Sequence, residues 1–147
     1  MSIDQLPEIA LAMVASGKGI IAIDESNATI KKRFDSVGVE CTEENRRAYR
    51  EMLLTTPNLN EYISGAILYD ETIRQKTKDG VPFTKIMLDN GILPGIKVDA
   101  GTTPLAGFPG EVVTQGLDGL RERLNEYAAL GAKFAKWRAV ININIEE

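Results

Sequence analysis

The sequence predicts an α/β fold in which parallel strands alternate with helices and curve into a β/α barrel. Four segments that read as strands begin near residues 19, 63, 93 and 132, with enough chain after each of the first three for a helical crossover. No G-x-G-x-x-G pattern follows the first segment, which disfavours a dinucleotide-binding fold. A barrel would also gather one set of charged residues on its inward face, near the C-terminal ends of the strands: Asp24, Lys97, Lys136 and Arg138.

Length and composition indicate one ordinary globular domain spanning residues 1–147. The net charge of −4 argues against non-specific nucleic-acid binding and against an anionic membrane partner. No apolar run is long enough to span a membrane, and the N-terminus does not resemble a signal peptide, so we expect a cytoplasmic protein. The single cysteine allows no internal disulfide.

The absence of histidine limits the possible chemistry. It excludes Ser-His-Asp and Cys-His catalysis and every zinc site that uses imidazole ligands. Metal-free chemistry based on lysine, carboxylate and tyrosine side chains is therefore favoured.

The first third of the chain predicts a helix, a strand and a second helix. Apolar residues at helical spacing over residues 3–16 predict a packing helix that stops at Gly17. Residues 19–24 predict a buried strand that ends in Asp24. Ser26, Asn27 and Thr29 follow, so the strand delivers a carboxylate and hydroxyls to a helix that ends near Gly38. A phosphate site and an ordinary helix cap are equally consistent with this pattern.

The middle of the chain predicts a third helix beginning at Thr42, with Tyr49, Met52 and Leu53 on its inner face. Its arginines are most simply explained as a solvated face; they are Arg46, Arg47 and Arg50. Residues 63–69 predict the second strand. The segment from 70 to 91 is mixed, with a turn at 79–82 and a short helix over 83–88.

The last third predicts a strand over 93–99 that has Lys97 in its middle, turns over 100–110, and an amphipathic helix that closes at Gly131. The final strand, 132–140, places Lys136 and Arg138 on one face because side chains alternate along a strand. These two cations indicate either an anion-binding or electrophilic site, or an edge strand with solvated charges.

Several strings, in order from Gly17 to Val140, resemble class I fructose-bisphosphate aldolase: G-K-G-I-I-A-I-D-E-S, T-E-E-N-R-R, G-I-K-V-D, P-L-A-G, T-Q-G-L-D-G-L and F-A-K-W-R. The resemblance implies a (β/α)8 TIM barrel. It also implies reversible cleavage of fructose 1,6-bisphosphate to dihydroxyacetone phosphate and glyceraldehyde 3-phosphate, in glycolysis and gluconeogenesis, through a lysine Schiff base and without a metal or other cofactor.

The resemblance also assigns residues. It implies that Asp24 lies beside the bond that breaks and that Lys136 and Arg138 assist imine formation and cleavage. Ser26 and Lys97 match residues that bind the 6-phosphate. Two further residues match positions near phosphate groups: Arg33, and Thr29, where the family usually has serine.

The 147 residues account for only the first four β/α units and an N-terminal helix, whereas a full barrel takes about 250 residues. We therefore expect an N-terminal half without the imine-forming lysine, inactive alone, ending in a run over 142–147. Two alternatives remain open: a non-catalytic module that binds sugar phosphates, and a half barrel that forms homo-oligomers by pairing its open edges.

Overall fold

The computed structural model describes residues 5–143. Its main sheet has four parallel strands in the order β1-β2-β3-β6, namely β1 (Gly19–Ile23), β2 (Ile63–Leu68), β3 (Leu93–Lys97) and β6 (Phe134–Lys136). This order and direction confirm the predicted α/β fold with a parallel sheet. All four predicted strands are present, although the last is much shorter than the predicted 132–140. The predicted terminal run lies partly outside the described residues.

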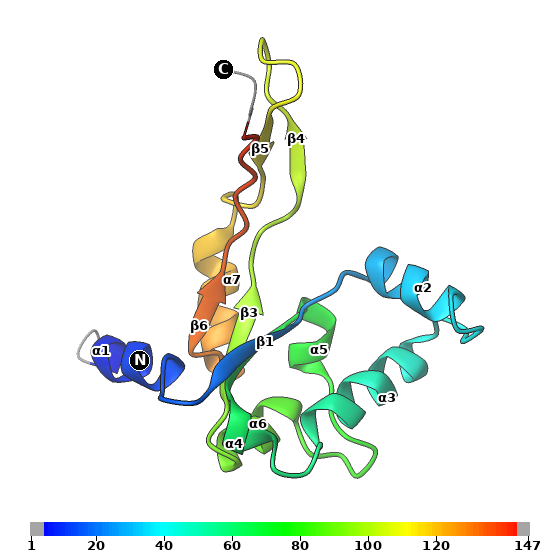
Figure 1. Ribbon diagram of the computed structural model, residues 1–147, viewed down its shortest axis with the longest axis vertical. Coiled ribbons are helices and arrows are strands. Elements are labelled where there is room, and N and C mark those ends of the chain that lie inside the picture. The colour runs from blue at the N-terminus through cyan, green and yellow to red at the C-terminus, as the bar shows by residue number, and fades with distance from the viewer. Residues whose placement is uncertain (1–4, 144–147) are drawn as a thin grey trace.

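The remaining elements connect these strands in sequence (Figure 1). The helices are α1 (Leu6–Met13), α2 (Asn27–Asp35), α3 (Glu43–Leu54), α4 (Leu59–Tyr62), α5 (Asp70–Arg74), α6 (Phe83–Asp89) and α7 (Leu120–Ala129). A two-stranded antiparallel hairpin, β4 (Thr102–Pro104) with β5 (Val112–Thr114), lies between β3 and α7. Figure 1 shows this hairpin projecting beyond the sheet, with the red segment that follows β6 alongside it.

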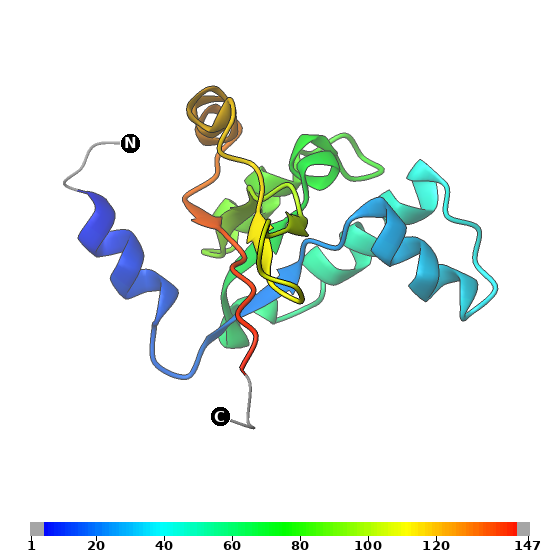
Figure 2. The same cartoon turned by 90° about the horizontal axis from the view of Figure 1, so that it is seen from above.

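One face of the sheet carries the core. Buried apolar side chains from alternate strand positions, such as Ile23, Leu68 and Ile96, pack with Phe83 and Met87 of α6. Seen from above, the helices between β1 and β6 form an arc around this side of the sheet (Figure 2). The sequence produces this layer because continuous apolar strands bury one face against amphipathic helices.

The opposite face is concave, and within residues 5–143 no helix layer covers it as on the core face. Its positions are fixed by the strand register, which pairs Ile67 with Gly95, Gly95 with Phe134, and Lys97 with Lys136. Ile20 of β1 lies on this face and is 39% exposed. The sheet is therefore half of a barrel whose inward face is partly open.

The sheet is strongly curved. The outer strands β1 and β6 are three strand spacings apart, roughly 14 Å in a flat sheet. Even so, the ammonium of Lys136, the last residue of β6, lies 2.8 Å from the carboxylate of Asp24, which follows β1. Curvature toward the concave face brings these two side chains together.

Two expectations about helices are wrong. Helix α1 has no buried residue, and Leu6 and Val14 of its predicted apolar face are 52% and 73% exposed, so it is not a packing helix within the described residues. In α3, Met52 is 60% exposed and Arg50 is buried, so these two positions differ from the prediction, whereas Leu53 packs against the core as predicted. Arg50 is buried because it binds a carboxylate from another element, Glu25.

Candidate functional site

A cavity of about 520 Å³ lies at the C-terminal ends of the parallel strands. The turn after β1, the end of β2, the β3–β4 segment and the chain after β6 all contribute to it. Its lining is Asp24, Glu25, Ser26, Thr29, Tyr69, Lys97, Asp99, Ala100, Gly101 and Arg138. Parallel strands present their chemistry at this edge, so the cavity is the candidate site.

Two ion pairs lie at this cavity. Lys136 Nζ donates to Asp24 Oδ2 at 2.8 Å, with the aspartate side chain 13% exposed. Lys97 Nζ lies 2.9 Å from Asp99 Oδ1 and donates to the main-chain oxygen of Asp99 at 2.6 Å. Each lysine is thus held in place by an aspartate on the same concave side of the sheet.

Asp99 is the most deeply buried of these carboxylates, with its side chain 3% exposed. Burial raises its pKa, but the hydrogen bond and charge of Lys97 outweigh burial and hold the pKa of Asp99 below its ordinary value. The amide of Gly101 and the charge of Lys136 act in the same direction. Asp99 Oδ2 is buried without a hydrogen-bond partner among the described residues.

The β1–α2 turn supplies hydroxyl groups. Ser26 caps α2 by accepting a hydrogen bond from the amide of Thr29 at 3.4 Å, and its hydroxyl lies 3.1 Å from that of Thr29. Both residues line the cavity. The predicted helix cap is therefore present, and it lines the same cavity as Lys97. Ser26 and Thr29 can thus both cap α2 and contact a ligand.

Unlike Lys97 and Lys136, the third cation of the cavity, Arg138, is not paired with a carboxylate of the described residues. It is exposed, lines the cavity, and its guanidinium makes no ion pair with the part of the chain that the structure describes. Its main-chain oxygen accepts from the Thr114 hydroxyl of β5 at 2.7 Å. The hairpin thereby fixes the backbone of Arg138 while the side chain is left to meet an anion.

Arg33 does not line the cavity. It lies on α2, its side chain is 58% exposed, and it forms an ion pair with Glu25. The other six candidates, Asp24, Ser26, Thr29, Lys97, Lys136 and Arg138, lie together at the cavity, either in its lining or, for Lys136, paired to Asp24.

Sequence reasoning did not select three side chains of the site: Glu25, Tyr69 and Asp99. Strand alternation places Tyr69 on the same face as Gly65 and Ile67, and Asp99 on the same face as Lys97. Strand alternation could therefore have identified both Tyr69 and Asp99 from the sequence. Glu25 alternates away from Asp24, and only its partners reveal its role.

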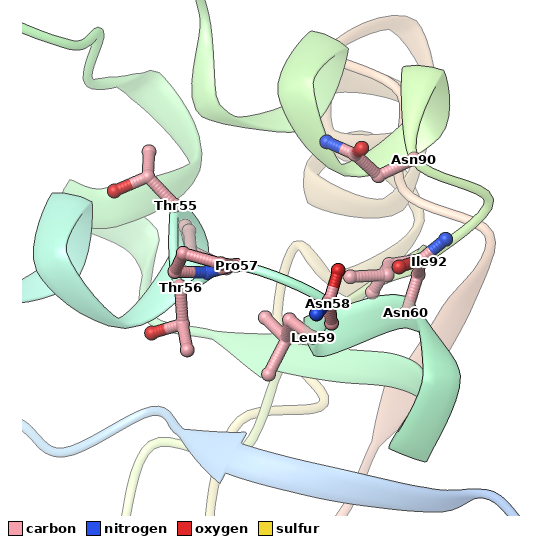
Figure 3. Close-up of a pocket in the computed structure, with 9 residues that line it drawn as sticks. Thr55, Thr56, Pro57, Asn58, Leu59, Asn60, Asn90 and Ile92 are labelled. Atoms are coloured by element: carbon pink, nitrogen blue, oxygen red, sulfur yellow. The ribbon is translucent and has the colours of Figure 1, made fainter.

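A second cavity, of about 150 Å³, lies beside the end of α3 (Figure 3). Threonine and asparagine side chains dominate its lining, with Asn58 and Asn90 on opposite sides, and no charged residue contributes. Asn58 adopts a left-handed backbone conformation with φ of 60°. Without a titratable group in its lining, this cavity offers neither an acid nor a base to activate its threonine hydroxyls.

Two further kinds of feature are absent from residues 5–143. Within that range no helix is both long and apolar enough to cross a membrane. Nor do three or more potential metal-ligating side chains cluster there.

Comparison with known proteins gives consistent matches. The model of the glycolytic family described as fructose-bisphosphate aldolase class-I matches residues 5–147. A probable fructose-bisphosphate aldolase class 1 of Xanthomonas campestris pv. campestris is 77% identical over 143 residues, 97% of this chain. The cytoplasmic isozyme of fructose-bisphosphate aldolase from Spinacia oleracea is 56% identical over 98% of this chain.

A solved structure is also similar. Fructose-bisphosphate aldolase from Plasmodium falciparum, crystallised with TRAP and a small-molecule inhibitor, superposes with a TM-score of 0.93 at 50% identity and covers 96% of this chain. This chain covers 41% of that structure, 43% of the Xanthomonas relative and 40% of the spinach one. The similarity thus extends over almost all of this chain and less than half of each relative.

Proposed function

Because the chain belongs to the class I fructose-bisphosphate aldolase family, we propose that its concave face supplies part of the site at which such an aldolase cleaves a sugar bisphosphate. Lys97, Ser26 and Thr29 bind a phosphate, whereas Asp24, Lys136 and Arg138 contact the sugar near the reacting bond. The supporting observation is one cavity that combines two lysine–aspartate pairs, two hydroxyls and an uncommitted guanidinium.

The charges of the cavity suit a phosphosugar. Each lysine is already paired to an aspartate, so Arg138 gives the cavity as a whole the positive charge that favours an anionic sugar phosphate. The Asp24 carboxylate can accept a proton from a sugar hydroxyl, and the adjacent Lys136 ammonium can donate a hydrogen bond to a sugar oxygen. Arg33, which lies outside the cavity, would reach a phosphate only if it left Glu25.

Calorimetric titration with fructose 1,6-bisphosphate tests the binding part of the proposal. The Lys97→Gln variant should lose about tenfold or more in affinity, since it removes a charge-assisted hydrogen bond to the phosphate. Lys85→Gln is the matched control, because the exposed Lys85 side chain pairs with the exposed side chain of Asp89 on α6, and neither residue lines the cavity. Absence of binding by the unmodified chain at millimolar ligand would overturn the proposal.

The covalent step needs a different test. The resemblance implies that the imine-forming lysine belongs to a later strand than the four present here, so we propose that these 147 residues alone bind without cleaving. Borohydride reduction in the presence of dihydroxyacetone phosphate should trap no adduct by intact mass. An adduct on Lys97 or Lys136, or a cleavage rate within tenfold of a complete aldolase, would contradict this inactivity.

We further propose that residues 1–147 fold as one domain that remains in the cytoplasm. The spinach relative, which is named a cytoplasmic isozyme, supports this location. Fractionation of cells expressing a tagged chain would decide it, and recovery from an organelle or membrane fraction would contradict it.

Self-association is a second candidate function, favoured by the open concave face and by the free edges of β1 and β6. Two copies would supply the eight parallel strands of a closed barrel. Sedimentation equilibrium should then show a dimer that Ile20→Lys weakens, because Ile20 lies on the concave face of β1. Val37→Lys, at an exposed apolar residue after α2, is the control. A monomer at every concentration would exclude this candidate.

A further inference from the structure

Helix α3 directs two arginines, one turn apart, toward the ends of β1 and β2. Arg46 binds both oxygens of Glu71 at the start of α5, with distances of 2.8 and 2.7 Å. Arg50 binds Glu25 in the turn after β1. Its Nη1 donates to the carboxylate at 2.6 Å, and its Nη2 donates to the main-chain oxygen of the same residue at 3.1 Å.

The Arg50–Glu25 contact is buried. The arginine side chain is 3% exposed and the glutamate side chain 9%. Two charges at this depth persist only when paired with good geometry, and removal of one partner leaves the other uncompensated. Arg33 also binds Glu25, but its side chain is 58% exposed, so solvent screens that pair far more.

The Arg50–Glu25 contact affects the site because Glu25 lies between two residues of that site in the chain. Glu25 separates Asp24, which pairs with Lys136, from Ser26, which caps α2 and lines the cavity. A planar guanidinium that holds both the carboxylate and the main-chain oxygen of one residue restrains that residue's side chain and backbone together. The two neighbours are then restrained as well.

We propose that Arg50 is a positioning residue, which holds the β1–α2 turn through Glu25 so that Asp24 and Ser26 face the cavity. Arg50 itself does not line the cavity. This inference rests on the proposed function for its effect on ligand affinity, whereas its effect on the turn can be measured without ligand.

The first variants are Arg50→Lys and Arg50→Gln. Lysine keeps the charge but cannot donate in a fixed fork to two oxygens, so both variants should lose about tenfold in affinity for fructose 1,6-bisphosphate by calorimetry. Arg47→Gln is the matched control. Arg47 lies on the same helix with its side chain 15% exposed, and it pairs with Glu44 and Glu51, away from the turn. Its loss should leave affinity unchanged.

Hydrogen exchange of the ligand-free chain measures the turn directly. The amides of Thr29 and Ile30 both donate to the main-chain oxygen of Ser26 at 2.9 Å. In Arg50→Lys these two amides should exchange faster relative to the rest of α2. Unchanged exchange would overturn the positioning role. If the unmodified chain binds no ligand, the proposed function fails, and the exchange result alone decides this inference.

The double variant Glu25→Gln with Arg50→Gln separates positioning from stability. It removes both buried charges, so its urea midpoint should rise above that of Arg50→Gln alone. Affinity should stay low, since a glutamine side chain on α3 is too short to hold both groups of residue 25. Recovery of affinity together with stability would mean that Arg50 has a structural role alone.

Discussion

At the scale of single residues, Phe134 determines the shape of the concave face. Its ring lies over the two strand glycines that neighbour it, Gly65 of β2 and Gly95 of β3. A Cβ on Gly65 would lie 3.1 Å from ring atom Cε1, and one on Gly95 would overlap the ring. Glycine at both positions lets an aromatic ring lie close to the backbone, which a flat row of larger side chains would prevent.

The Gly95→Ala variant should therefore be destabilised by about 1–3 kcal/mol, because the new methyl group forces Phe134 or the backbone to shift. Gly19→Ala is the control, since a Cβ there meets nothing within 4 Å, and alanine in a strand should be neutral or slightly stabilising. Urea unfolding measures both. Equal effects of the two substitutions would contradict the steric argument.

Asp99 predicts a pH dependence of stability. Its pKa is lower in the folded chain than the ordinary value of 3.8, so the folded state binds fewer protons there than the unfolded state. Its contribution is present above about pH 4 and is lost as pH falls through the folded pKa.

The measurement for Asp99 compares urea midpoints of the unmodified chain and Asp99→Asn. The unmodified chain should be more stable at neutral pH, where the Lys97–Asp99 pair is intact. The difference should shrink as the pH falls below about 4, toward the lowered pKa of the folded carboxylate. A difference that is constant with pH would show that Lys97 does not stabilise the ionised form.

At the scale of elements, α3 carries both an N-terminal cap that its sequence encodes and the arginines that contact the segments around the site. Thr42 begins the helix by accepting a hydrogen bond from the amide of Asn45 at 3.1 Å, and two glutamates in the first turn complement the positive helix end. Arg46, which binds Glu71 of α5, lies one turn further along the helix. Arg50, which binds Glu25 in the β1–α2 turn, lies two turns further along. The start of α3 thus determines where these arginines lie.

Thr42→Ala should lower the free energy of unfolding by about 1 kcal/mol, because an amide of the first turn loses its acceptor. Thr42→Ser keeps a hydroxyl and should retain most of that stability. Urea unfolding followed by far-ultraviolet circular dichroism provides the comparison. If serine proves as costly as alanine, the threonine methyl group rather than the cap would be responsible.

The sequence was sufficient for the four parallel strands and the longer helices, but not for the short helices α4 and α5 or for the exposed hairpin. Buried parallel strands have continuous apolar runs, so β1, β2 and β3 could be predicted. The β4 and β5 strands are three residues each in a segment rich in glycine and proline, so only turns were predicted there. Strand β6 ends at Lys136, and the chain then follows the hairpin, where Asn142 donates to the main-chain oxygen of Gly110.

The same contrast holds for the candidate site. Asp24, Lys97 and Lys136 could be predicted because strand alternation places each on the concave face. Arg50 could not be predicted, since an arginine beside other arginines on a helix is usually solvated. Its burial depends on Glu25, 25 residues away in the sequence, and no local pattern encodes that contact.

At the scale of the whole molecule, the two faces of the sheet differ in how they are stabilised. The helix-covered face holds the buried apolar cluster, including Leu68 and Phe83, each 0% exposed. The concave face holds lysine–aspartate pairs, glycines and the Phe134 ring. Folding of this half barrel therefore depends on the helix-covered face, and the concave face remains available for a ligand or for further strands.

The hairpin lies outside both faces, which predicts where the chain opens first. Residues 105–110 at its tip are all exposed, and Phe108 is 62% exposed. The tip is held by local main-chain bonds, such as that from Leu105 to Glu111 at 2.9 Å, so opening it disturbs no core contact. Brief digestion with elastase, which cuts after small side chains, should cut after Ala106 first, as identified by mass spectrometry of the early fragments. Ala66 and Ala132 are buried internal controls, and an initial cut at either one would mean that the helix-covered face opens before the hairpin.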